Sequence, residues 1–90
     1  MEPPCFWRDD IDSLAFRISG HGGLCVVHRL ALRTLIGHLP NADAALAYWG
    51  TNRAVFERAA AIKIARTGVA PGANFHLNSR ELEDAGAASP

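Results

Sequence analysis

The sequence predicts a small α+β domain built as a β-hairpin, a short helix, a long helix and a third strand. Two observations predict the strands: apolar residues alternate over residues 14–18 and again over 74–78, and a glycine-rich turn separates the first run from the apolar run 24–28. A third predicts the helices, because between residues 30 and 67 the apolar spacing changes to three and four. We therefore expect a mostly antiparallel three-stranded sheet packed on the long helix.

The hairpin is the first element that the pattern supports. Leu14, Phe16 and Ile18 alternate with small or polar residues, which is typical of a half-buried strand. The turn 20–23 contains three glycines, which can adopt positive φ at low cost. Residues 24–28 then supply the second strand.

The helical region divides at a proline. Leu32, Leu35 and Ile36 predict a short helix that stops near Gly37 and Pro40. Asn41 can cap a second helix, which we expect to continue to Thr67 with Gly68 as its left-handed terminator. Such a helix is about 40 Å long at its ordinary rise per residue.

The long helix carries two apolar strips. One contains Leu46, Trp49, Phe56, Ala60 and Ile64, and the other contains Tyr48, Val55, Ala59 and Ile62. Together the strips are wider than the stripe of about 100° with which a helix covers a sheet. The second strip must therefore pack against the short helix, the N-terminal arm or another copy of the chain. The expected three-stranded sheet also leaves two edges and one face exposed, and the outward face is only partly polar, with Ala15 among Arg17 and His76. Two-fold pairing is the commonest way to bury such surfaces, so we expect a homodimer.

The remaining segments complete a single domain over residues 1–90. Residues 1–12 are expected to form an entry arm anchored by Phe6 and Trp7, and residues 13–82 to form the folded core. The third strand follows from the alternation of Phe75 and Leu77 with polar neighbours. The acidic, small-residue segment 83–90 is expected to fray.

Composition and charge restrict the partners. The chain has 49% hydrophobic and 20% charged residues, which is typical of a globular domain. No apolar run approaches the roughly 20 residues that cross a bilayer, the N-terminus lacks the order of a secretion signal, and the two cysteines suit reduced thiols. We therefore expect a cytoplasmic protein without a membrane partner. The net charge of zero provides no strong field for nucleic acid.

Cysteine and histidine residues suggest a metal site that the strand geometry disfavours. Cys25 and His28 are spaced C-x-x-H, but residues three apart on a strand point to opposite faces. No second ligand pair of the kind found in structural zinc sites is present. We expect neither a metal nor another cofactor.

Catalytic pairs can be drawn between Cys25 and a histidine, or between Ser79 and His76, but neither has an identifiable orienting carboxylate. Phosphate-binding glycine motifs are also missing, because the Gly20–Gly23 segment links two strands. We therefore expect no catalytic residue and no enzymatic activity.

Arg53 is the candidate interaction or ligand residue, because it lies within the apolar strip between Trp49 and Phe56. Its structural interpretation is that the side chain covers Trp49 and pairs with Glu57 one turn later. Its functional interpretation is that it binds an anionic ligand or the carboxylate of a partner.

One set of residues resembles a known family. The first part of the pattern is Phe16, the Gly22-Gly23 turn and Cys25, and the second part is Trp49, Asn52-Arg53, Phe56-Glu57, Ala60 and Lys63. This arrangement resembles the domain of unknown function 1488 family of small bacterial proteins, over residues 13–82. The chain departs from that pattern at His28 and Leu30, where a serine and a glutamate would form a capping box. The resemblance implies a hairpin, helix, helix, strand layout and no activity.

These observations predict an uncharacterised small bacterial protein that acts as a non-enzymatic, self-associating interaction module. One alternative is a small nucleic-acid-associated regulator, and a second is a minor enzyme or small-ligand binder.

Overall fold

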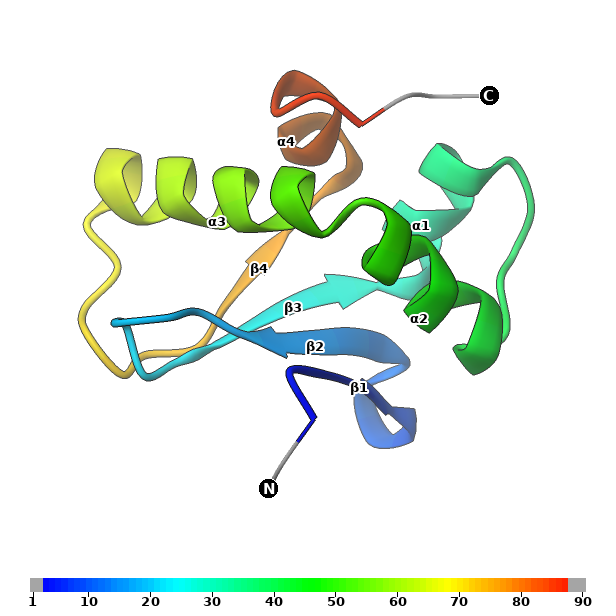
Figure 1. Ribbon diagram of the computed structural model, residues 1–90, viewed down its shortest axis with the longest axis horizontal. Helices are drawn as coiled ribbons and strands as arrows, with labels where there is room; N and C mark the ends of the chain where they lie inside the picture. The colour runs from blue at the N-terminus through cyan, green and yellow to red at the C-terminus, as the bar shows by residue number, and fades with distance from the viewer. Residues whose placement is uncertain (1–2, 88–90) are drawn as a thin grey trace.

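The hairpin predicted from the alternating residues forms the centre of the sheet in a computed structural model, which describes residues 3–87 (Figure 1). The strands are β1 (Cys5–Arg8), β2 (Ser13–Arg17), β3 (Leu24–His28) and β4 (Phe75–Leu77). The helices are α1 (Arg29–Ile36), α2 (Ala42–Thr51), α3 (Arg53–Thr67) and α4 (Ser79–Asp84), with a 3-10 turn, η1, at Asp9–Ile11. The α+β class is therefore confirmed.

The sheet has four strands in the order β1-β2-β3-β4, so the prediction of three strands is wrong. The two N-terminal pairings are antiparallel and β4 runs parallel to β3. The missing strand is the segment expected to be an arm: Phe6 pairs with Ala15 and Trp7 with Leu14. Pairing with β2 satisfies backbone groups that a free arm would leave to water. Residues 1 and 2 of the expected arm lie outside the described residues.

The predicted long helix is interrupted at Asn52, where α2 ends and α3 begins in a different direction (Figure 1). Asn52 has φ −113° and ψ 24°, and its side-chain amide donates to the carbonyl of Tyr48 at 3.0 Å. Gly50, Thr51 and Asn52 all have low helix propensity, which gives the break a local cause. The predicted ends are confirmed, because Asn41 caps α2 and Gly68 ends α3 at φ 67°.

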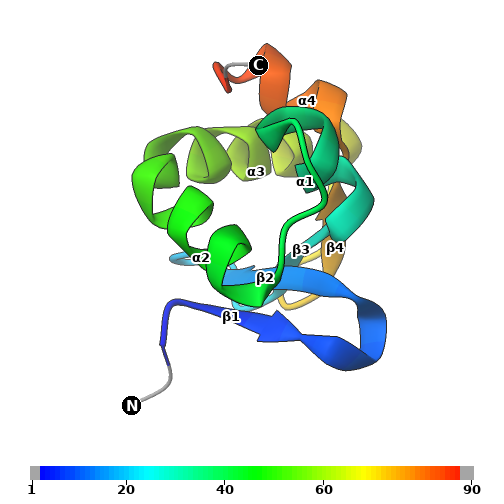
Figure 2. The same cartoon turned by 90° about the vertical axis from the view of Figure 1, so that its right-hand side faces the viewer.

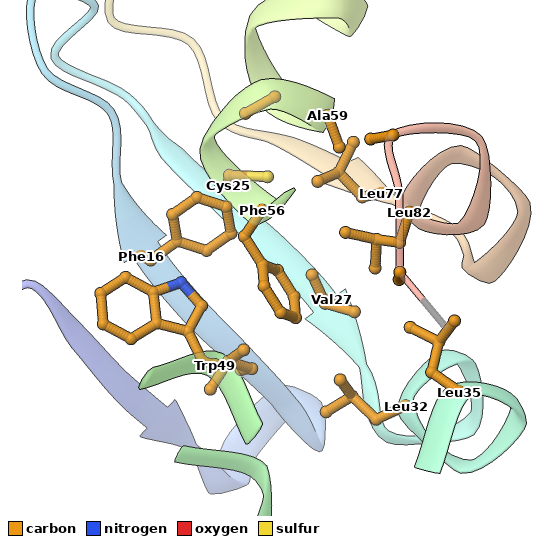
Figure 3. Packing of buried hydrophobic residues seen from close by; sticks show 14 of the residues in the cluster. Phe16, Cys25, Val27, Leu32, Leu35, Trp49, Phe56, Ala59, Leu77 and Leu82 are labelled. Atoms are coloured by element: carbon orange, nitrogen blue, oxygen red, sulfur yellow. The ribbon is translucent and has the colours of Figure 1, made fainter. Parts of the chain in front are cut away.

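The core lies between the sheet and the helices (Figure 3). The ring of Phe16 on β2 packs edge-on against Phe56 on α3, with the centroids 5.7 Å apart. The same ring lies 5.9 Å from the ring centroid of Trp49 on α2, at a tilted angle. Leu32 and Leu35 of α1 and Leu82 of α4 close the other end. The indole nitrogen of Trp49 has no hydrogen-bond acceptor among the described residues, and Figure 3 shows it on the side of the ring near Phe16.

The C-terminal segment belongs to the core, so the expectation that it frays is wrong for residues 83–87. Asn78 and Glu81 form a capping box that starts α4, and Leu82, Ala85 and Ala87 are buried. This segment packs on α3, where the Ala85 carbonyl accepts a 2.8 Å hydrogen bond from Arg58. It therefore covers part of the second apolar strip, in which Ala59 is buried and Ile62 stays exposed, and α4 is none of the three covers expected from the sequence. Residues 88–90 lie outside the described part of the chain.

The helices lie on one face of the sheet (Figures 1 and 2). The two central strands alternate accordingly: Leu14, Phe16, Cys25 and Val27 point into the core, whereas Ala15 and Val26 belong to the opposite phase. Within residues 3–87, no helix has both the length and the apolar character needed to cross a bilayer.

Candidate functional site

Arg53 begins α3 and lies over the ring of Trp49, with 5.1 Å between its guanidinium carbon and the ring centroid. Its Nε donates a 2.7 Å hydrogen bond to Oε1 of Glu57. Both contacts belong to the structural interpretation of this residue. The side chain is 56% exposed, so it also remains accessible from solvent.

Cys25 and His28 are not brought together. The thiol of Cys25 is fully buried in the core, where burial raises its pKa above the ordinary value. His28 is exposed at the end of β3 and caps α1, because its Nδ1 accepts a 3.1 Å hydrogen bond from the amide of Leu30. Histidine thus provides the N-cap of α1. Across residues 3–87, no three cysteine, histidine or acidic side chains gather closely enough to hold a metal ion.

Cys5 and Cys25 are both free. They face the same side of the sheet in one cross-strand row, in which Phe16 of β2 separates them. Two strand spacings place their Cα atoms about 9–10 Å apart. Because a disulfide requires less than about 7 Å, the two cannot bond without movement of the backbone. Burial raises the pKa of the Cys5 thiol to about 12, against a smaller opposing effect of Arg53.

The β2–β3 turn is fixed by the loop that precedes β4. The amide of Gly72 donates to the carbonyl of His21 at 2.7 Å, and the amide of Leu24 donates to Oδ1 of Asn74 at 3.0 Å. The ring of His21 packs edge-on against Phe75, with the centroids 5.7 Å apart. These contacts give the glycine-rich turn a structural role.

The face of the sheet away from the helices has an apolar centre. One cross-strand row contains Phe6, Ala15, Val26 and His76, in strand order. Phe6 and Val26 are half-buried and do not pack against the helix-side core. Ala15 is fully buried between them because it is the smallest side chain in the row. We name the row Phe6, Ala15 and Val26 the open-face row.

Polar side chains border the open-face row. Arg8, Ser13 and His28 form the cross-strand row on one side. On the other side Arg17 is opposite Leu24. Arg8 is engaged with Asp10, to whose Oδ1 its Nε donates at 2.8 Å. The open face thus has an apolar centre and a rim that is polar except at the half-buried Leu24.

A groove of about 400 Å³ lies between α3 and α4. Lys63 and Glu81 face each other across it at 3.1 Å. The same Glu81 oxygen accepts a 2.9 Å hydrogen bond from the backbone of Asn78, so one carboxylate joins the start of α4 to α3. The residues that line the groove are Ala59, Ile62, Lys63, Arg66, Thr67, Asn78, Arg80, Glu81 and Asp84.

The sequence pointed to Arg53 and to an exposed, partly apolar face of the sheet, but it predicted neither that Phe6 belongs to that face nor this groove. The signal for β1 was present, since Phe6 and Trp7 lie in a short apolar run, but its pairing partner is not local. The signal for α4 was also present, because Asn78 followed by Glu81 three residues later is a capping-box pattern. Comparisons of the chain with protein-family models, with curated proteins and with solved structures gave no match.

Proposed function

We propose that the protein is a non-enzymatic interaction module that forms a homodimer through the open face of its sheet. The observation that carries this proposal is the open-face row, which lies on the side of the sheet opposite α1, α2, α3 and α4. Apolar side chains at the centre and polar side chains at the rim are the arrangement found in protein–protein interfaces. A two-fold axis lets one such surface serve both subunits.

The sheet edges and the helices support self-association less well. β1 has four residues and follows Pro3 and Pro4, and proline is one of the features that block edge pairing. β4 has only three residues. On the helical side, α4 packs on the strip that first suggested a dimer, which leaves Ile62 as its exposed member at 41%. The open face is therefore the best-supported surface.

The size of the face sets the expected affinity. Four strands of up to five residues measure roughly 19 by 17 Å, or about 300 Å² in projection. A stable interface usually buries about 800 Å² on each partner. We therefore expect a weak dimer that dissociates in the micromolar range.

Sedimentation equilibrium from low micromolar to near-millimolar concentration tests the proposal. The wild type should pass from monomer to dimer across this range. Val26→Lys places a charge at the centre of the open face and should keep the chain monomeric throughout. Circular dichroism should show that the variant keeps its fold, because Val26 does not belong to the helix-side core.

Leu39→Lys is the matched control, since Leu39 is 53% exposed and lies outside the sheet, in the segment between α1 and α2. This variant should dimerise as the wild type does. A monomer mass for the wild type at every concentration would contradict the proposal. Equal loss of the dimer in both variants would move the interface away from the open face.

The nucleic-acid-associated regulator remains the alternative, but it has less support. Three cations of α3 are engaged within the chain: Arg53 with Glu57, Arg58 with the Ala85 carbonyl and Lys63 with Glu81. A minor enzyme or small-ligand binder remains a further alternative. Membership of the domain of unknown function 1488 family also stays a proposal, supported by the residues that carry the resemblance.

A further inference from the structure

Two arginines on the groove between α3 and α4 have no partner within the described chain. Most arginines are engaged, as the pairs of Arg8 with Asp10 and Arg29 with Asp12 illustrate. The structure gives no side-chain hydrogen bond, ion pair or ring contact within residues 3–87 for Arg33, Arg66 or Arg80. Arg66 and Arg80 line the same groove, one from each helix.

The Lys63–Glu81 pair fixes the relation between the two helices. Both side chains are largely buried, at 18% and 30% exposure, so each compensates the other's charge within the groove wall. The remaining charges are Arg66, Arg80 and Asp84. The groove therefore carries a net positive charge, which comes from the two guanidinium groups that have no partner within the described chain.

The other lining residues define the rest of the binding surface. Thr67 and Asn78 lie on the wall and carry polar side chains. Ile62 is 41% exposed, so the wall also offers an apolar side chain, whereas Ala59 is buried. A volume of about 400 Å³ is within the range of small-molecule sites and is larger than an inorganic anion requires.

We propose that the groove between α3 and α4 binds a small organic phosphate monoester. The phosphate lies between Arg66 and Arg80, and the organic group lies against Ile62. Arginine suits this role because its planar fork donates parallel hydrogen bonds to phosphate oxygens. A phosphate dianion can accept hydrogen bonds from two guanidinium groups at once. A single cation on an exposed helix face does not provide two such donors.

Phenyl phosphate is the probe, because it joins a dianion to an apolar ring. The full-length, ¹⁵N-labelled chain is titrated at neutral pH and constant ionic strength, and amide shifts are followed by NMR. We expect saturable shifts confined to residues 59–67 and 78–84, with a dissociation constant in the millimolar range. Inorganic phosphate should bind at least about threefold more weakly, because it lacks the apolar contact. Phenol alone should leave these amides unchanged.

Arg33→Gln is the matched control for Arg66→Gln and Arg80→Gln, because it removes the same charge from the third arginine without a partner. Each groove variant should weaken binding about five- to tenfold, as expected for the loss of a charge-assisted hydrogen bond. The control should bind within about twofold of the wild type, because only screened, long-range charge is lost. Val26→Lys should also bind normally, which separates this proposal from the dimer.

Three results would overturn the assignment. Shifts that stay linear with concentration would show that there is no site. An equal loss in Arg33→Gln would show attraction to net charge alone. Equal affinity for inorganic phosphate and phenyl phosphate would contradict the role of the apolar wall.

Discussion

Arg53 joins two helices across the break between them, because its guanidinium lies 5.1 Å from the ring centroid of Trp49 in α2 while the residue itself begins α3. Its hydrogen bond to Glu57 holds the side chain in this position. The contact turns an exposed cation into a part of the α2–α3 junction. Cation–π contacts at exposed sites contribute about 0.5–1 kcal/mol, so the junction gains a modest stabilisation.

Substitutions of Arg53 should therefore affect folding more than binding. Arg53→Leu should lower the free energy of unfolding by less than about 1 kcal/mol, because leucine can still cover Trp49. Arg53→Glu should cost about 1–2 kcal/mol, because it also places a like charge one turn from Glu57. Urea denaturation measures both values. If Arg53→Glu unfolds like the wild type but abolishes the dimer or the binding of a ligand, the functional interpretation of this residue is correct instead.

Gly23 should tolerate no side chain. A Cβ at this position would lie 2.2 Å from the carbonyl oxygen of Ala73, in the loop that fixes the turn. Gly23→Ala should cost at least about 2 kcal/mol, because the loop backbone must move. Gly50→Ala is the control, since a Cβ there meets nothing within 4 Å and the residue lies in α2. That variant should be stabilised by about 0.5–1 kcal/mol. Thermal melts of both variants would show whether the signs differ.

Leu82 should behave as a core residue although it lies near the C-terminus. Its side chain is fully buried against α3 and α1, so Leu82→Ala should lower the free energy of unfolding by about 2–5 kcal/mol. Ile62→Ala is the comparison, because Ile62 is exposed on α3 and should cost under about 1 kcal/mol. Similar small losses in both variants, measured by urea denaturation, would mean that α4 is not stably docked.

The half-buried Cys5 thiol and the buried Cys25 thiol should make the free energy of unfolding fall at alkaline pH. Burial raises the pKa of Cys5 to about 12 from the ordinary value of 9.0, so above pH 9 the unfolded chain loses a proton that the folded chain retains. Loss of that proton favours the unfolded state, so the contribution is complete below pH 9 and decreases as pH rises toward 12. Denaturation at pH 8 and at pH 10 measures the decrease.

Cys5→Ala provides the control for this effect. Its free energy of unfolding should decrease less steeply between these pH values than that of the wild type. Cys25 remains in both proteins, with its own pKa raised by burial, so part of the decrease should persist. Identical slopes would show that the Cys5 thiol is not protected in the folded state.

The local elements of this fold could be read from the sequence because their causes are local. Alternation about Leu14 and Phe16 and the glycines that follow predicted the hairpin, and Asn41 and Gly68 marked two helix ends correctly. Of the candidate site, the pairing of Arg53 with Glu57 and its contact with Trp49 followed from helical spacing. Each of these features depends on residues within a few positions of one another.

The contacts between segments that are distant in the sequence depended on the tertiary structure. Phe6 and Trp7 form a strand only because they pair in register with β2. Phe75 and Leu77 run parallel to β3 because of where the chain returns to the sheet after α3. Docking of α4 on α3 covered part of the apolar strip for which the sequence named no single partner: Ala59 is buried and Ile62 stays exposed. Apolar periodicity predicts that a surface is buried, but it does not predict which segment covers it. The reason is that burial lowers the free energy equally well against any complementary surface. The sequence alone therefore determined the hairpin, the third predicted strand and the two outer ends of the α2–α3 region, while packing determined β1, the docking of α4, and which arginines share a groove.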